Sequence, residues 1–228
     1  MAPAPRKERS GIRSLLTSVL SHPKRTERIV TALAGAGRQA LMRGLGLAFA
    51  LTPIVATSAS ANPVKSLYTT VDLKACKKLE RPGGAAWHCP GLSGVPVYVA
   101  KGGLKQFVSA GTDAARRRAA TQTLAGANSI FEQGRVRALV EWRFDRRGDK
   151  QLPYAIIVRF HTGADLRRGD VLVVLKVAPR ETCHLAYVDA LANENAIALA
   201  RSIADTKART FDCNLESIAA GAWGRGPM

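Results

Sequence analysis

The sequence predicts an α+β fold, in which one C-terminal helix packs on a twisted antiparallel sheet and disulfides staple the domain. Residues 136–144 and 154–160 alternate between apolar and polar side chains, as half-buried strands do. Residues 190–209 instead carry apolar side chains at helical spacing. All four cysteines lie beyond residue 61, and an even cysteine count in an exported domain is typical of disulfides.

Residues 1–61 have the composition of a basic extension followed by a signal peptide. The apolar run of residues 44–56 follows basic residues and precedes Ala59-Ser60-Ala61, the small-residue pattern of a cleavage site. The run is shorter than the ~20 residues that cross a bilayer as a helix. We therefore expect cleavage after Ala61, no stable membrane span afterwards, and a periplasmic or secreted mature protein.

The start of the chain leaves two alternatives open. Residues 1–41 are an unusually long basic lead, and translation from Met42 rather than Met1 would give a signal peptide of ordinary length. The same residues also fit an amphipathic organelle-targeting peptide, because they are rich in arginine and serine and poor in acids. Residues 62–228 are expected to form one exported α+β domain, with a loose tail after about residue 218.

The charge balance favours an anionic partner. The chain has a net charge of +17, and cleavage after Ala61 would lower it to +10. Outside the cytoplasm, the common polyanions are lipopolysaccharide, anionic lipid headgroups and acidic glycans, which such a charge attracts. Nucleic acid is not expected as a partner, because an exported protein rarely meets it and the few aromatic residues suggest no stacking surface.

The other strands and turns are predicted from β-prone runs bounded by glycine and proline. Asp145 to Lys150 is predicted as a polar turn between two antiparallel strands, with Gly148 available for a left-handed conformation. A short helix is expected over 113–122, and 123–133 is expected to be mostly loop. Strands are further predicted at 68–71, 87–89, 96–100, 104–108, 171–177 and 182–188.

Four cysteines allow three pairings, of which we favour Cys76–Cys89 and Cys183–Cys213 because each pair brackets one local unit. The second bridge would fasten the C-terminal helix to the sheet. A zinc site is the alternative, since histidines adjoin Cys89 and Cys183. It is disfavoured because there is no Cys-x-x-Cys and neighbouring strand residues point to opposite faces.

Several segments resemble a family of small secreted alphaproteobacterial proteins of unassigned function. The resemblance lies in Tyr68-Thr69-Thr70-Val71-Asp72 with Cys76, Trp87-His88-Cys89-Pro90-Gly91, Gly94-Val95-Pro96-Val97, Val140-Glu141-Trp142-Arg143, and residues 182–190. It spans most of residues 68–213. The resemblance implies export and the cysteine framework, and it assigns no site or activity.

Enzyme chemistry is not indicated by any motif. The sequence contains no phosphate-binding loop, no Gly-x-Ser-x-Gly and no His-Glu-x-x-His, and we predict no cofactor. Cys183 beside His184 suggests a nucleophile and base, but adjacent strand residues diverge and an exported cysteine is usually bridged. Glu141 and Asp145 are candidate paired carboxylates only because they lie close together in the sequence.

A basic sheet face is the remaining candidate for binding. If the apolar positions of the two long strands face inward, Arg137, Arg143, Arg159 and His161 share the opposite face. The simpler interpretation is a solvated face. The sequence therefore predicts an exported, non-enzymatic binding module for an envelope component or a protein partner. The alternatives are a small periplasmic hydrolase with unassigned acid and base residues, or an inhibitor of a cell-wall hydrolase.

Overall fold

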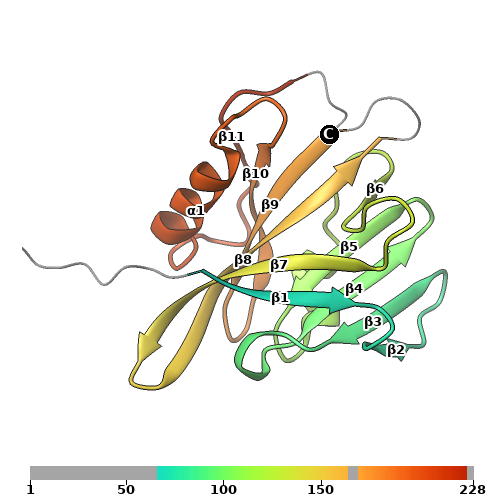
Figure 1. Cartoon of the computed structure of the whole chain (residues 1–228). Coiled ribbons are helices and arrows are strands. Elements are labelled where there is room, and N and C mark those ends of the chain that lie inside the picture. The colour runs from blue at the N-terminus through green and yellow to red at the C-terminus, as the bar shows by residue number, and fades with distance from the viewer. Residues whose placement is uncertain (1–65, 164–168, 225–228) are drawn as a thin grey trace, which may run out of the picture. The chain divides into compact units, whose positions relative to one another are not determined.

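The computed structural model describes residues 66–163 and 169–224. The predicted signal peptide and its cleavage site lie outside these residues. The described residues form two β-sheets and one α-helix (Figure 1). The predicted α+β class with one helix packed on a sheet is thus correct in outline, but the domain contains more sheet than the sequence indicated.

The main sheet has seven strands in the order β1-β7-β8-β9-β10-β11, with β6 pairing with β8. Neighbours are antiparallel except β10 and β11, which are parallel. The strands are β1 Ser66–Asp72, β6 Asn128–Ser129, β7 Arg137–Arg147, β8 Lys150–Thr162, β9 Gly169–Val177, β10 Thr182–Asp189 and β11 Ile218–Ala220. The segment expected to be a loose tail therefore supplies a strand, because Ile218 to Ala220 pair with Ala186 to Val188.

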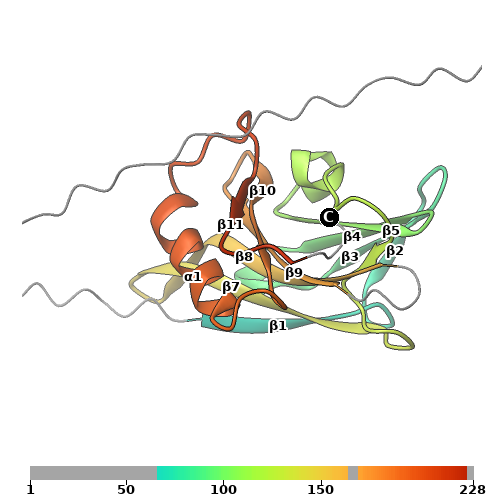
Figure 2. The same cartoon turned by 90° about the horizontal axis from the view of Figure 1, so that it is seen from above.

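A second, four-stranded antiparallel sheet packs against one face of the main sheet (Figure 2). Its strands are β2 Lys77–Leu79, β3 Ala85–Cys89, β4 Val97–Gly102 and β5 Lys105–Ala110. The core between the sheets includes Val97, Val99, Val108, Val140, Trp142, Ile156, Val158 and Phe160. One helix covers only one face of the main sheet, so the large apolar side chains of the other face need this second layer.

Helix α1, Ala196–Lys207, packs on the opposite face of the main sheet through Ala200, Ile203 and Ala204. It begins six residues later than the predicted residue 190. The Asp189 carboxylate accepts hydrogen bonds from the amides of Leu191 and Ala192 at 2.9 and 3.0 Å, which fixes a turn there instead.

The described residues also contain short 3-10 segments, of which η1 is Leu92–Gly94. The helix predicted over 113–122 is replaced by two separate turns, η2 Ala114–Arg116 and η3 Arg118–Ala120. These two turns lie on the outer face of the small sheet, where Ala114 and Ala120 pack with Ala86, Tyr98 and Ala100.

Both predicted disulfides are present. Cys76 pairs with Cys89 and Cys183 with Cys213, and no described cysteine is free. The first bridge joins the start of β2 to the end of β3, and the second joins β10 to the chain after α1. The alternative zinc site therefore lacks its thiolates.

The β7–β8 hairpin extends beyond the rest of its sheet. Within the described residues, β1 pairs with β7 only as far as Arg143, and β9 pairs with β8 only from Ala155 onward. Residues 144–153 consequently form a two-stranded ribbon, which we call the β7–β8 ribbon, and it projects from the sheet in Figure 1. The predicted turn of 145–150 is shorter, because the strands continue to a two-residue loop, Gly148-Asp149.

Candidate functional site

The four predicted binding residues lie on one side of the main sheet, and that side also carries helix α1. Arg143 is buried beneath the helix. Its guanidinium donates two hydrogen bonds to Asp205 of α1, Nε to Oδ1 at 2.8 Å and Nη2 to Oδ2 at 2.7 Å. The Arg143 side chain is 5% exposed. The expectation that this arginine stands on an open face is therefore wrong, because α1 covers it.

A second ion pair lies beside the first. Glu141 on β7 is buried, and Arg201 on α1 donates to its two carboxylate oxygens at 2.7 and 3.2 Å. Arg201 and Asp205 are four residues apart and so share one face of α1. We call Glu141, Arg143, Arg201 and Asp205 the helix clamp.

The clamp is almost fully hydrogen-bonded. The Ser66 hydroxyl contacts both Glu141 and Arg143, and Tyr154 Oη donates to Asp205 Oδ1 at 2.7 Å. Burial, reinforced by the neighbouring Asp205 carboxylate, raises the pKa of Tyr154 to about 12. The Arg143 pKa also lies above its ordinary value: burial is the largest single influence and lowers it, but Asp205, Tyr154 and Glu141 together outweigh burial. These groups orient the helix on the sheet.

The other three predicted residues also have acidic neighbours. Arg137 Nε donates to Asp72 Oδ2 at 2.7 Å at the edge of the sheet. Asp170 accepts from Arg159 Nη1 at 3.2 Å and lies 2.6 Å from His161 Nδ1. This face therefore presents less free positive charge than its sequence suggests, and its role in binding stays a prediction.

The tip of the β7–β8 ribbon carries three cations around one acidic loop residue, Asp149. Arg147 and Lys150 are cross-strand neighbours beside the loop, Arg146 lies next to them, and all three side chains are exposed. Within the part of the chain that the structure describes, no ion pair involves any of them. Like charges directly opposite each other in a sheet are destabilising, so this pair does not serve the ribbon's own stability.

The base of the ribbon is held firmly to the domain. Arg209, just after α1, donates to both oxygens of Asp145 at 2.6 and 3.0 Å, and its guanidinium lies 3.6 Å from the centre of the Tyr154 ring. Hydrogen bonding to Arg209 lowers the pKa of Asp145.

On the other face of the ribbon, Ser93 donates to Gln151 at 3.1 Å. Gly148 has the positive φ of 59° that a two-residue hairpin loop starting with glycine needs.

A β-bulge shapes the ribbon's junction with the sheet. The register of β7 and β8 shifts between Arg143 and Phe144, so Pro153 and Ala155 face consecutive residues of β7. As a result Tyr154 joins the core under α1 instead of the core shared by Trp142 and Ile156, where the alternation placed it.

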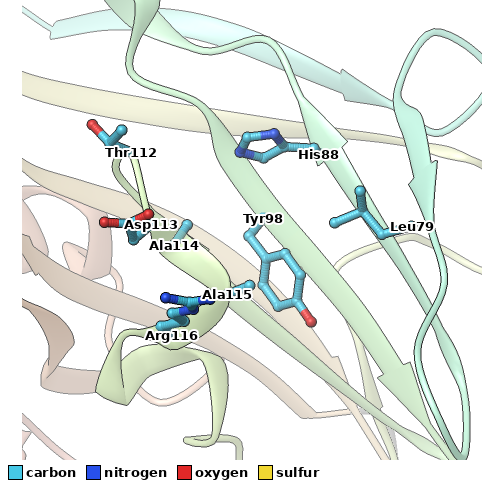
Figure 3. A pocket seen from close by; sticks show the side chains of 8 residues that line it. All are labelled: Leu79, His88, Tyr98, Thr112, Asp113, Ala114, Ala115 and Arg116. Atoms are coloured by element: carbon cyan, nitrogen blue, oxygen red, sulfur yellow. The ribbon is translucent and has the colours of Figure 1, made fainter.

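A half-open pocket of about 230 Å³ lies on the outer face of the small sheet. Figure 3 shows His88 and Tyr98 projecting from neighbouring strands, with the segment 112–116 beside them. Sequence reasoning missed this site, since the lining residues His88 and Tyr98 become neighbours only through the β3–β4 register. The lining residues are Leu79, His88, Tyr98, Thr112, Asp113, Ala114, Ala115 and Arg116.

The catalytic pairings considered from sequence do not assemble. Cys183 is bridged, whereas His184 is fully buried with Nδ1 3.0 Å from Tyr187 Oη. Glu141 and Asp145 are each paired with a different arginine. Among residues 66–163 and 169–224, no group of three or more His, Cys, Asp or Glu side chains is arranged to hold a metal ion.

Stability should depend on pH through His184. Burial lowers its pKa from 6.5 to about 3. Between these values the unfolded chain binds a proton that the folded chain excludes, so the free energy of unfolding falls as pH falls below 6.5. The expected loss is roughly 1.4 kcal/mol per pH unit, or about 2 kcal/mol at pH 5.

Urea denaturation at pH 7 and pH 5 measures this contribution. In His184→Leu the titrating group is gone. The difference in the free energy of unfolding between pH 7 and pH 5 should therefore shrink by about 2 kcal/mol, whatever the variant's absolute stability. An unchanged difference in this variant would show that other groups cause the pH dependence.

None of the described helices is long and apolar enough to cross a membrane. Comparison of the chain with protein-family models, with curated proteins and with solved structures gave no match.

Proposed function

We propose that the chain is an exported, non-enzymatic binding module that holds an anionic component of the cell envelope, or an acidic protein partner, through the tip of the β7–β8 ribbon. One observation carries the proposal: Arg147 and Lys150 stand opposite each other at a projecting tip, and neither forms an ion pair with a described residue. Two like charges that lower the stability of the free protein become a favourable site when an anion binds between them. The two disulfides fit an oxidising compartment outside the cytoplasm.

The geometry of the ribbon supports this role. Asp145, on the same face, is hydrogen-bonded by Arg209, and Arg147 interacts with it only as a further nearby charge. With Asp149 in the loop as the other acidic residue, Arg146, Arg147 and Lys150 leave the tip net positive. The contact of Arg209 with Asp145 holds the base of the ribbon, so a partner would meet an ordered element and lose little affinity to ordering it. Leu152, cross-strand from Asp145, adds an exposed apolar surface behind the cations.

Reversal of the tip charges should weaken binding strongly. The probes are lipopolysaccharide, anionic vesicles and acidic glycans, tested with Arg147→Glu/Lys150→Glu. We expect about tenfold weaker binding or more, because two attractions become repulsions, and a melting temperature within a few degrees of the parent. Parent binding should weaken with salt, since the Debye length falls from about 10 Å at 0.1 M to about 3 Å at 1 M. Salt-independent binding, or a variant that binds like the parent, would refute the proposal.

An inhibitor of a cell-wall hydrolase is a second candidate function, favoured by the projecting hairpin itself. A basic ribbon tip suits insertion into the acidic cleft of such an enzyme. An inhibition assay with a muramidase separates this function from envelope binding, and the same double variant should lose the inhibition.

A further inference from the structure

The pocket on the small sheet is a separate site that the proposed function does not use. Its floor comes from β2, β3 and β4, and its wall is the segment 112–116 around η2. At about 230 Å³ it is smaller than the roughly 300–1,000 Å³ of most ligand pockets, so it suits a single small group.

Two basic residues lie at this pocket, Arg116 in its lining and Lys77 beside the lining residue His88. Lys77 is the cross-strand neighbour of His88, which in turn is the neighbour of Tyr98, so the three side chains stand in a row on one face. Arg116 lines the opposite wall. Lys77 and Arg116 are both exposed, and neither forms an ion pair with another described residue.

The acidic lining residue has a cationic neighbour outside the pocket. Asp113 Oδ2 lies 3.7 Å from Arg117 Nη2, and Arg117 is itself anchored by the backbone carbonyls of Pro179 and Arg180. The Asp113 charge is therefore partly compensated, and Arg116 in the lining together with Lys77 beside it outnumbers this one carboxylate. Thr112 and Tyr98 add hydroxyl groups, which donate to an anion as readily as they accept.

We propose that this pocket binds a phosphate monoester group. A phosphate monoester carries about −1.5 to −2 charge at pH 7 and three strong acceptor oxygens. This charge and these oxygens match the two cations, Lys77 and Arg116, and the hydroxyl and imidazole groups of the two walls. A carboxylate offers only two oxygens and one charge. The group can belong to a free metabolite or to a lipid headgroup, since both present the same chemistry at a half-open pocket.

Calorimetry and amide chemical-shift mapping with glycerol 3-phosphate test the site, with glycerate as the carboxylate control. Binding should shift the amides of residues 112–116 and should exceed that of glycerate. Vesicles of phosphatidylcholine with and without phosphatidic acid distinguish the two sources. Binding to the vesicles but not to glycerol 3-phosphate assigns the lipid headgroup, and binding to neither overturns the proposal.

Matched variants separate the pocket from the general charge of the protein. Lys77→Ala and Arg116→Ala should each weaken binding roughly fivefold to tenfold. Lys78→Ala and Arg118→Ala remove the same charges from exposed residues away from the pocket, and should leave binding within about twofold. Lys78 is cross-strand from Trp87, on the opposite face of β2 from Lys77, and Arg118 is not a lining residue. Asp113→Asn should strengthen binding, because it removes the acidic group from the lining. Equal losses in the pocket and control variants would overturn the assignment.

The ribbon and the pocket use different residues, so the two proposals fail separately. Arg147→Glu/Lys150→Glu should bind glycerol 3-phosphate as tightly as the parent, even where it loses the anionic envelope partner.

Discussion

Replacing Arg143 with methionine is expected to lower the free energy of unfolding by about 3–5 kcal/mol, the cost of leaving a partner of a buried ion pair uncompensated. Methionine keeps much of the side-chain volume, so the loss reports the missing charge and hydrogen bonds more than a cavity. Asp205 would lose both of its bonds to the guanidinium, and Glu141 would lose a cation 3.6 Å away. Urea denaturation followed by tryptophan fluorescence measures the change.

Two further variants test the cause of that loss. Arg137→Met removes an arginine whose ion pair lies at the exposed sheet edge, and should cost at most about 1 kcal/mol. Arg143→Met/Asp205→Leu removes both partners, and should recover most of the stability because no buried charge is left unpaired. If the single Arg143 variant is as stable as Arg137→Met, the helix clamp does not hold α1 on the sheet.

The Cys183–Cys213 bridge gives the second large effect. It closes a loop with a sequence separation of 30 residues, and the chain-entropy relation assigns it about 3.6 kcal/mol. Cys183→Ala/Cys213→Ala should therefore unfold at a markedly lower urea concentration. Because this bridge ties the chain after α1 to β10, hydrogen exchange should rise first in the amides of α1.

The other disulfide is the natural comparison. Cys76–Cys89 has a sequence separation of 13, which corresponds to about 2.9 kcal/mol. Its double alanine variant should lose stability without faster exchange in α1, because it staples β2 to β3. Uniform exchange changes in both variants would contradict the assignment of the second bridge to the helix.

Much of the fold was readable from local sequence patterns. The alternation of β7 and β8 predicted their antiparallel pairing, and the bracketing of local units by cysteines predicted both disulfides. Such patterns act over a few residues, where backbone geometry fixes the direction of each side chain. They do not show which sheet a short strand joins, so the second sheet and the parallel strand β11 were missed.

The candidate site shows the same limit. Alternation placed Arg143 on the correct side of β7, but it could not show that α1 would cover that side. Arg201 and Asp205 were a readable signal, since two charged residues four apart on a helix with a narrow apolar face can pair with charges beneath it. The ribbon and the pocket depend on where neighbouring strands end and on cross-strand register, which a single sequence does not encode locally.

The most direct test of the proposed function compares two double variants that change net charge equally. One is Arg147→Glu/Lys150→Glu at the ribbon tip, and the other is Arg137→Glu/Arg159→Glu on the face that carries α1. Arg143 is left unchanged because its reversal would break the helix clamp. The measurement is the dissociation constant of each variant for the anionic probe that binds the parent most tightly at low salt. We predict that the ribbon variant loses about tenfold or more in affinity while the other stays within about threefold. Equal losses in both variants, or a larger loss in the second, would contradict the ribbon as the binding element.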